Sequence, residues 1–147
     1  LTKGGKLIEG IFQGATINTP SMLCVADYLD ALNWLREIGG LSAAIDRSLR
    51  NLAVIEAFVA GHDWIHFLAD DPAQRSNTSV CLTLDLADDQ VKAMTALLDR
   101  EGAAHDIGAY RDAPAGLRIW CGATIEASDL EKLMPWLEWA YRQVSEG

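Results

Sequence analysis

Apolar side chains recur at steps of three and four residues in four stretches of this chain, a spacing typical of helices that bury one face. We therefore expect helices over residues 20–38, 42–60, 88–101 and 128–144. A glycine follows each of the first three stretches, where helices commonly end. Pro135 falls inside the fourth, and its missing N–H should kink or divide that helix.

Polar side chains suited to cap a helix begin these stretches. Ser42 and Asp88 precede the second and third, and Ser128 with Glu131 has the spacing of a capping box. At the first helix, Asn18 or Thr19 can supply the cap, with a proline in the first turn. A helix N-terminus also presents free N–H groups to phosphates, so Asn18 and Thr19 fit either a capping or an anion-binding role.

Between the second and third helices, the hydrophobic period changes to the alternation of a strand. Residues 64–68 and 79–86 are separated by a polar turn, which predicts antiparallel partners, and residues 105–108 and 117–121 predict two more short strands. The resulting order is strand, strand, helix, strand, strand, helix. This order predicts a two-layer α+β fold, with a small mixed sheet and helices packed on one face.

The first residues differ from the rest in composition. Residues 1–19 hold four glycines and show little periodicity, so we expect an extended arm that comes from a preceding domain. Residues 20–147 contain no repeat, linker or low-complexity stretch, and we expect them to form one domain.

Charge and composition exclude several classes of protein. The 147 residues carry a net charge of −9, the wrong sign for a protein that neutralises nucleic-acid phosphates. No apolar run approaches the roughly 18 residues that a membrane span needs. Three cysteines without CxxC spacing favour a reducing, cytoplasmic setting.

Arg118 is the residue that most strongly indicates a binding site. It stands between Leu117 and Ile119 in an apolar strand, where a cation is costly to bury unless an anion meets it. The guanidinium fork matches a carboxylate, so a substrate carboxylate is one interpretation. A salt bridge to Asp112, Glu126 or another local acid is the other.

Two other groups of residues give weaker signals. Arg111 lies in a polar turn, where a solvated loop cation is the simpler interpretation. His62 and His66 are four residues apart, but they fall at a strand entry and not on a helix face, so we expect no metal site.

Three segments nevertheless resemble a known family, and the resemblance covers nearly the whole chain. The segments are KGGKLIEGIFQGATINTPSMLCVADYLDALNWLREIGGL, RSNTSVCL and IGAYRDAPAGLRIWCGATIEASDLEKLMPWLEWA. They resemble the C-terminal part of phosphoserine aminotransferase, in its alpha-proteobacterial form. The resemblance implies a fold-type-I pyridoxal-phosphate enzyme, which has a large cofactor domain followed by a small C-terminal domain and works as a cytoplasmic homodimer.

The resemblance also implies roles for individual residues. Asn18 and Thr19 match a turn that reaches the cofactor phosphate of the other subunit, and Arg118 matches the arginine that holds the substrate carboxylate. Tyr110 and Arg111 fall where other branches carry a His-Arg pair for the substrate phosphate, with Tyr in place of His. The spacing from this pair to Arg118 is one residue longer than in those branches.

The implied reaction moves an amino group from glutamate to 3-phosphohydroxypyruvate in serine biosynthesis, and pyridoxine-pathway substrates are a further expectation. The family places its Schiff-base lysine in the large domain, and none of the chain's four lysines matches that position: Lys3, Lys6, Lys92 and Lys132. Residue 1 is Leu, so we expect the smaller part of a larger enzyme, inactive alone. The alternatives are a stand-alone amino-acid-binding regulatory domain and a dimerisation domain.

Overall fold

The computed structural model describes residues 2–16 and 18–146, and the chain divides into two compact units. The first unit ends at Leu41 and the second begins at Ser42. The predicted boundary between an arm and a domain at residues 19 and 20 stays a prediction. Among the described residues, no helix is both long and apolar enough to cross a membrane.

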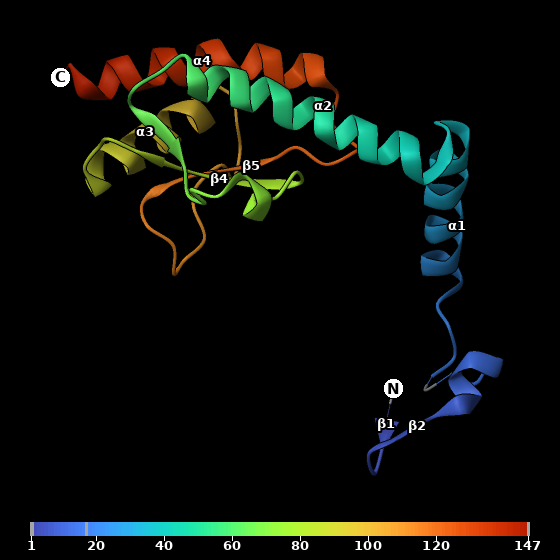
Figure 1. The fold of residues 1–147 in the computed structure, drawn as a ribbon. Coiled ribbons are helices and arrows are strands. Elements are labelled where there is room, and N and C mark those ends of the chain that lie inside the picture. The colour runs from blue at the N-terminus through green and yellow to red at the C-terminus, as the bar shows by residue number, and fades with distance from the viewer. Residues whose placement is uncertain (1, 17, 147) are drawn as a thin grey trace. The chain divides into compact units, whose positions relative to one another are not determined.

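The first unit contains a small hairpin and one long helix (Figure 1). Strands β1 (Thr2–Lys3) and β2 (Lys6–Leu7) pair antiparallel, a 3-10 helix covers Glu9–Gln13, and helix α1 spans Met22–Glu37. The α1 N-cap is Ser21, whose hydroxyl accepts a hydrogen bond from the Cys24 N–H at 3.4 Å. The cap predicted at Asn18 or Thr19 is therefore wrong, because the helix starts later than the proline suggested.

The second unit is built on a three-stranded antiparallel sheet with strand order β3-β4-β5. Its strands are β3 (Ile65–Phe67), β4 (Ser79–Leu84) and β5 (Gly116–Trp120). The antiparallel pairing of β3 with β4 confirms the prediction, but the described sheet is antiparallel throughout and not mixed. The strand predicted at 105–108 is reduced to a single bridge between Gly108 and Leu117, because Asp106 takes a left-handed φ of 50° that interrupts an extended backbone.

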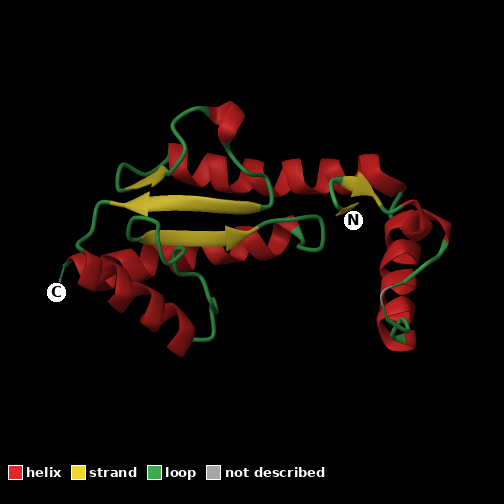
Figure 2. Ribbon diagram, turned by 90° about the horizontal axis from the view of Figure 1, so that it is seen from below, coloured by secondary structure: helices red, strands yellow, loops and turns green. Residues whose placement is uncertain are grey.

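Three helices lie on one side of this sheet, which confirms the predicted two-layer α+β arrangement (Figures 1 and 2). They are α2 (Gly40–Ala60), α3 (Asp88–Arg100) and α4 (Ala127–Ser145). Helix α4 passes through Pro135 without being divided. Proline lacks only one donor, and the helix packs along the core on both sides of it, with Leu130 and Leu137 buried.

All three of these helices begin one or two residues from the predicted caps. Helix α2 starts at Gly40, ahead of Ser42. The N-cap of α3 is Ala87, whose N–H donates to the Gln90 side chain at 3.0 Å. The N-cap of α4 is Glu126, without a side-chain cap bond, so the capping box at Ser128 is not formed.

Alternation along β4, and from Leu117 onward in β5, gives the sheet two different faces. One face carries Val80, Leu82, Leu117 and Ile119, each at most 4% exposed, and it packs against the helices. Complete burial of such a side chain contributes roughly 1.5–3 kcal/mol. The other face carries Cys81 and its cross-strand neighbour Arg118 together with other polar or half-buried residues. The pleat therefore excludes Arg118 from the core that encloses its neighbours.

Candidate functional site

Arg118 lies in a cavity of about 610 Å³ beside β5. The strand directs its side chain away from the helices, and the segment after α3 runs alongside and supplies one wall, including Asp106 and Tyr110. Ser79 at the start of β4 and Trp120 at the end of β5 also line it, and they are paired across the sheet. The cavity therefore joins residues from two strands, from the segment after α3 and from the beginning of helix α4.

The guanidinium of Arg118 is held by an acid, as the sequence predicted, but the acid is neither Asp112 nor Glu126. Nη2 donates to Asp106 Oδ2 at 2.7 Å and to the Asp106 carbonyl oxygen at 3.3 Å. Glu126 pairs instead with Arg47. The salt-bridge partner of Arg118 is thus Asp106, which the sequence analysis did not name. The turn at Asp106 brings its carboxylate beside β5.

An aromatic ring completes the environment of this cation. Arg118 Cζ lies 4.7 Å from the centroid of the Tyr110 ring, and the Tyr110 hydroxyl is 3.1 Å from the hydroxyl of Ser79. Polar contact with Tyr110 is the largest effect and raises the pKa of Arg118. Partial burial lowers this pKa, the nearby charge of Asp106 raises it again, and the net shift is upward. Arg118 therefore remains a fixed positive charge, with its side chain 26% exposed.

The guanidinium also retains unused donors. In the part of the chain that the structure describes, both hydrogen bonds of Arg118 come from Nη2, and neither Nε nor Nη1 donates to a protein acceptor. Nε and Nη1 are therefore available to a carboxylate that approaches from the cavity, whereas the two parallel bonds that this side chain favours also require Nη2. The arrangement is suited to binding a small carboxylate.

Arg111 is not brought into the same cavity as Arg118. It lines a second cavity of about 370 Å³, together with Lys92 and Thr95, and among the described residues Tyr110 alone lines both cavities. Tyr110 contacts Arg118 with its ring and Ser79 with its hydroxyl, so the structure gives it a supporting position. Phosphate binding by Tyr110 and Arg111 stays a prediction.

Asn18 and Thr19 lie in the first unit, in the segment that precedes the Ser21 cap. Both residues are exposed, and neither belongs to the described helix. Their predicted contact with a cofactor phosphate stays a prediction.

Sequence reasoning missed Ser79 and Asp106. Neither residue forms part of a local motif. The turn after α3 brings Asp106 to Arg118, and sheet register places Ser79 in the same cavity, in contact with Tyr110. The sequence indicated only that some acid should pair with Arg118, which did not single out Asp106. Ser79 stands at the start of an alternating strand, a position that is common in any sheet.

The chain's own residues do not provide a complete site for pyridoxal phosphate. Covalent attachment needs a lysine amine, and among the residues that the structure describes no lysine lines the cavity of Arg118. Lys92 lines the second cavity, Lys132 pairs with Asp129 at 3.5 Å on α4, and Lys3 and Lys6 are exposed in the first unit. Among the described residues, the cavity of Arg118 therefore offers a guanidinium but no lysine amine.

Comparison with known proteins gives a consistent result. No family model matches the chain. It is 58% identical over 141 residues to phosphoserine aminotransferase from Methanosarcina mazei, and 57% identical over 144 residues to that from Methanosarcina barkeri. These alignments cover 96% and 98% of the chain but 38% and 39% of the relatives. The chain thus spans about two fifths of the length of the curated relatives it matches.

Solved structures show the same fold. The phosphoserine aminotransferase from Bacillus circulans subsp. alkalophilus superposes with a TM-score of 0.79 at 19% identity, over 90% of this chain and 36% of that one. A phosphoserine aminotransferase studied for radiation damage of its Schiff base gives 0.81 at 15% identity, over 97% and 40%. Because the sequence identity to the two Methanosarcina relatives exceeds one half over nearly the whole chain, the chain belongs to the phosphoserine aminotransferase family and corresponds to a C-terminal portion of its members.

Proposed function

We propose that this chain supplies the substrate-carboxylate site of a pyridoxal-phosphate aminotransferase, which moves an amino group between glutamate and 3-phosphohydroxypyruvate in serine biosynthesis. Two findings support the proposal: the relatives named phosphoserine aminotransferase, and the guanidinium of Arg118 with unused donors in a cavity. Both of the proposed substrates carry a carboxylate next to the reacting carbon, so one arginine can serve both.

The role of Arg118 in this proposal is to bind and orient. Two parallel N–H···O bonds to a carboxylate fix both the position and the plane of the substrate, which aligns the reacting carbon with the cofactor. Pyridoxal phosphate, when bound in the whole enzyme, supplies the electron sink, and the attachment lysine lies outside this chain. We therefore expect the chain alone to be inactive.

Several finer features belong to the same proposal. The whole enzyme is a homodimer, in which Asn18 and Thr19 contact the cofactor phosphate of the other subunit. Arg111, with Tyr110 at its side, binds the substrate phosphate, and substrates of pyridoxine synthesis are also accepted. The enzyme is cytoplasmic, in keeping with three free cysteines. The alternative of a regulatory amino-acid-binding domain has no support among the relatives, which bear the name of an enzyme.

The test uses the full-length enzyme and its two half-reactions. Replacement Arg118→Ala should lower kcat/KM by about 10²- to 10³-fold with glutamate and with phosphoserine, since a charge-assisted bidentate pair contributes several kcal/mol. Arg111→Ala should reduce only the phosphoserine half-reaction. Equal losses in both half-reactions for Arg111→Ala would remove it from the phosphate role. Full activity of Arg118→Ala would refute the carboxylate site.

A further inference from the structure

We propose that Asp106 occupies the position of the ligand carboxylate on Arg118 when no ligand is bound, and that a carboxylate ligand must displace it. Asp106 then sets the affinity of the site, although it makes no contact with the bound ligand. This inference rests on the proposed carboxylate role of Arg118.

The contact between the two residues resembles half of a carboxylate complex. Asp106 Oδ2 lies 2.7 Å from Nη2 of Arg118, and the main-chain oxygen of Asp106 uses the same nitrogen at 3.3 Å. A bidentate ligand needs two neighbouring guanidinium nitrogens. A ligand that binds Nη2 therefore competes with the Asp106 carboxylate for that nitrogen. Asp106 accepts hydrogen bonds from one guanidinium nitrogen, whereas a bidentate ligand can accept from two.

The exposure of Asp106 makes this displacement inexpensive. Its side chain is 91% exposed, whereas that of Arg118 is 26% exposed. A carboxylate that is already in water gains little from an ion pair and loses little hydration when it leaves it. Competition from such a group should weaken ligand binding by only about two- to five-fold.

The backbone keeps Asp106 in place while its side chain remains free to turn away. Asp106 has a φ of 50°, a left-handed conformation that Asp tolerates better than most residues. On one side, His105 pairs with Asp99 of α3. On the other, the Ile107 carbonyl oxygen accepts a hydrogen bond from the Arg118 N–H at 2.8 Å. The Asp106 carboxylate therefore stays within reach of Arg118 before and after displacement.

The test is an acetate titration of the isotopically labelled chain at constant ionic strength, followed through the Nε–H resonance of Arg118. Asp106→Asn keeps the shape of the side chain but removes its charge, and the acetate midpoint should fall about two- to five-fold. Asp112→Asn is the matched control. It removes the same charge from an exposed residue of the same loop region, and it should leave the midpoint unchanged.

The outcomes separate this inference from the function on which it rests. An acetate midpoint that is equal or higher in Asp106→Asn than in Asp112→Asn overturns the inference and leaves the carboxylate site intact. Two results would overturn the carboxylate site itself. One is that acetate causes no saturable change in the wild type, Asp106→Asn or Asp112→Asn. The other is that acetate still shifts the resonances of residues next to position 118 in Arg118→Gln. A fall in the midpoint confined to Asp106→Asn supports the inference.

Discussion

The ring of Tyr110 faces the guanidinium of Arg118, with 4.7 Å between Arg118 Cζ and the ring centroid. The Tyr110 hydroxyl is hydrogen-bonded to the Ser79 hydroxyl on β4 at 3.1 Å, so Tyr110 links the loop to the sheet. The cation that we assign to ligand binding is thus supported from one side by an aromatic face and from another by Asp106. A cation above an aromatic ring gains about 0.5–1 kcal/mol at an exposed site.

Removal of this ring should weaken carboxylate binding. We expect Tyr110→Ala to raise the acetate midpoint of the chain by about two- to five-fold, because Arg118 loses its cation–π contact. Tyr110→Phe keeps the ring and should retain most of the affinity. If Tyr110→Phe raises the acetate midpoint as much as Tyr110→Ala does, then the hydroxyl contact with Ser79, and not the ring, supports Arg118.

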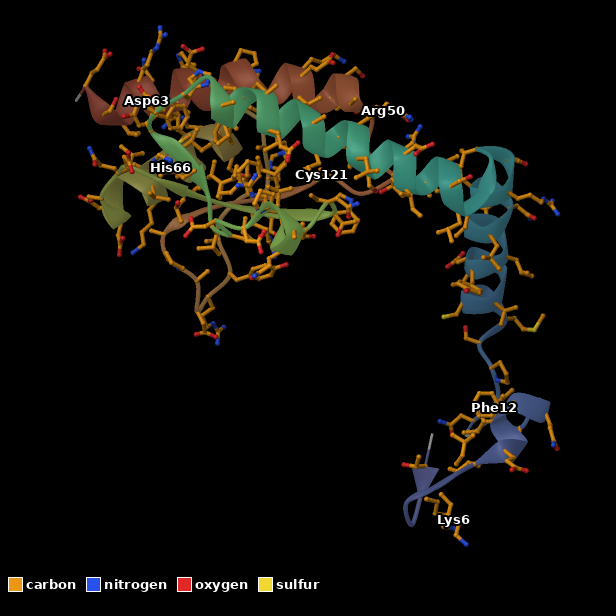
Figure 3. All side chains as sticks on the ribbon, viewed as in Figure 1. Lys6, Phe12, Arg50, Asp63, His66 and Cys121 are labelled. Carbon is orange, nitrogen blue, oxygen red and sulfur yellow. The ribbon has the colours of Figure 1, made fainter. Side chains whose placement is uncertain are left out.

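Asn51 on α2 should be essential for stability. Its Nδ2 donates to the main-chain oxygens of Cys121, Gly122 and Ile125 at 2.9–3.1 Å, and the residue is 2% exposed. Replacement Asn51→Leu leaves these oxygens without this donor, and it should lower the free energy of unfolding by about 2–4 kcal/mol in urea denaturation. Arg50→Ala, at an exposed neighbouring position, should change it by less than about 0.5 kcal/mol (Figure 3). Similar losses for both variants would contradict the role of Asn51.

Gly116 permits the close approach of β5 to β4. A Cβ at this position would lie 2.0 Å from the main-chain oxygen of Leu82, which is part of the paired strand. Gly116→Ala should therefore destabilise the chain by at least about 2 kcal/mol, since backbone has to move. The control is Gly108→Ala, whose Cβ meets nothing within 4 Å. Comparable thermal unfolding of the two variants would refute the steric argument.

Cys121 should make stability depend on alkaline pH. It is fully buried beneath α2 (Figure 3), and desolvation raises the pKa of its thiol to about 11 against a small opposing effect of a backbone hydrogen bond. An unfolded thiol ionises near pH 8.5, so between about pH 9 and 11 the unfolded state loses its proton first. The contribution is present below about pH 8.5 and is lost as pH rises to about 11, by up to about 3 kcal/mol.

The measurement is the free energy of unfolding at several values of pH between 8 and 11. Cys121→Ala should remove part of the alkaline decline, whereas Cys24→Ala, at an exposed thiol, should retain all of it. An identical pH dependence in the wild type and Cys121→Ala would show that this thiol does not contribute.

The sequence by itself determined most of the regular elements. Period and glycine positions predicted four helices and the antiparallel pair β3 and β4, because these signals depend on residues that are neighbours along the chain. The helix starts were less accurate. Ser21 stands at the N-cap in place of Asn18 or Thr19, and Ala87 in place of Asp88, because helix ends are specified less sharply than helix interiors. The sequence also identified Arg118 as a cation that needs an anion, because its apolar neighbours make that requirement local.

Only the tertiary structure decided which residues meet that cation. On α2 it buried Asn51 and Ile55 while leaving the apolar Ile45 half exposed, because only part of the helix packs against the core. Around Arg118 it selected Asp106, since a left-handed turn carries that carboxylate to β5. Strand register placed Ser79 beside the same site. The turn conformation at Asp106 and the pairing register of the strands bring together residues that are distant in sequence. No local sequence pattern specifies either of these features.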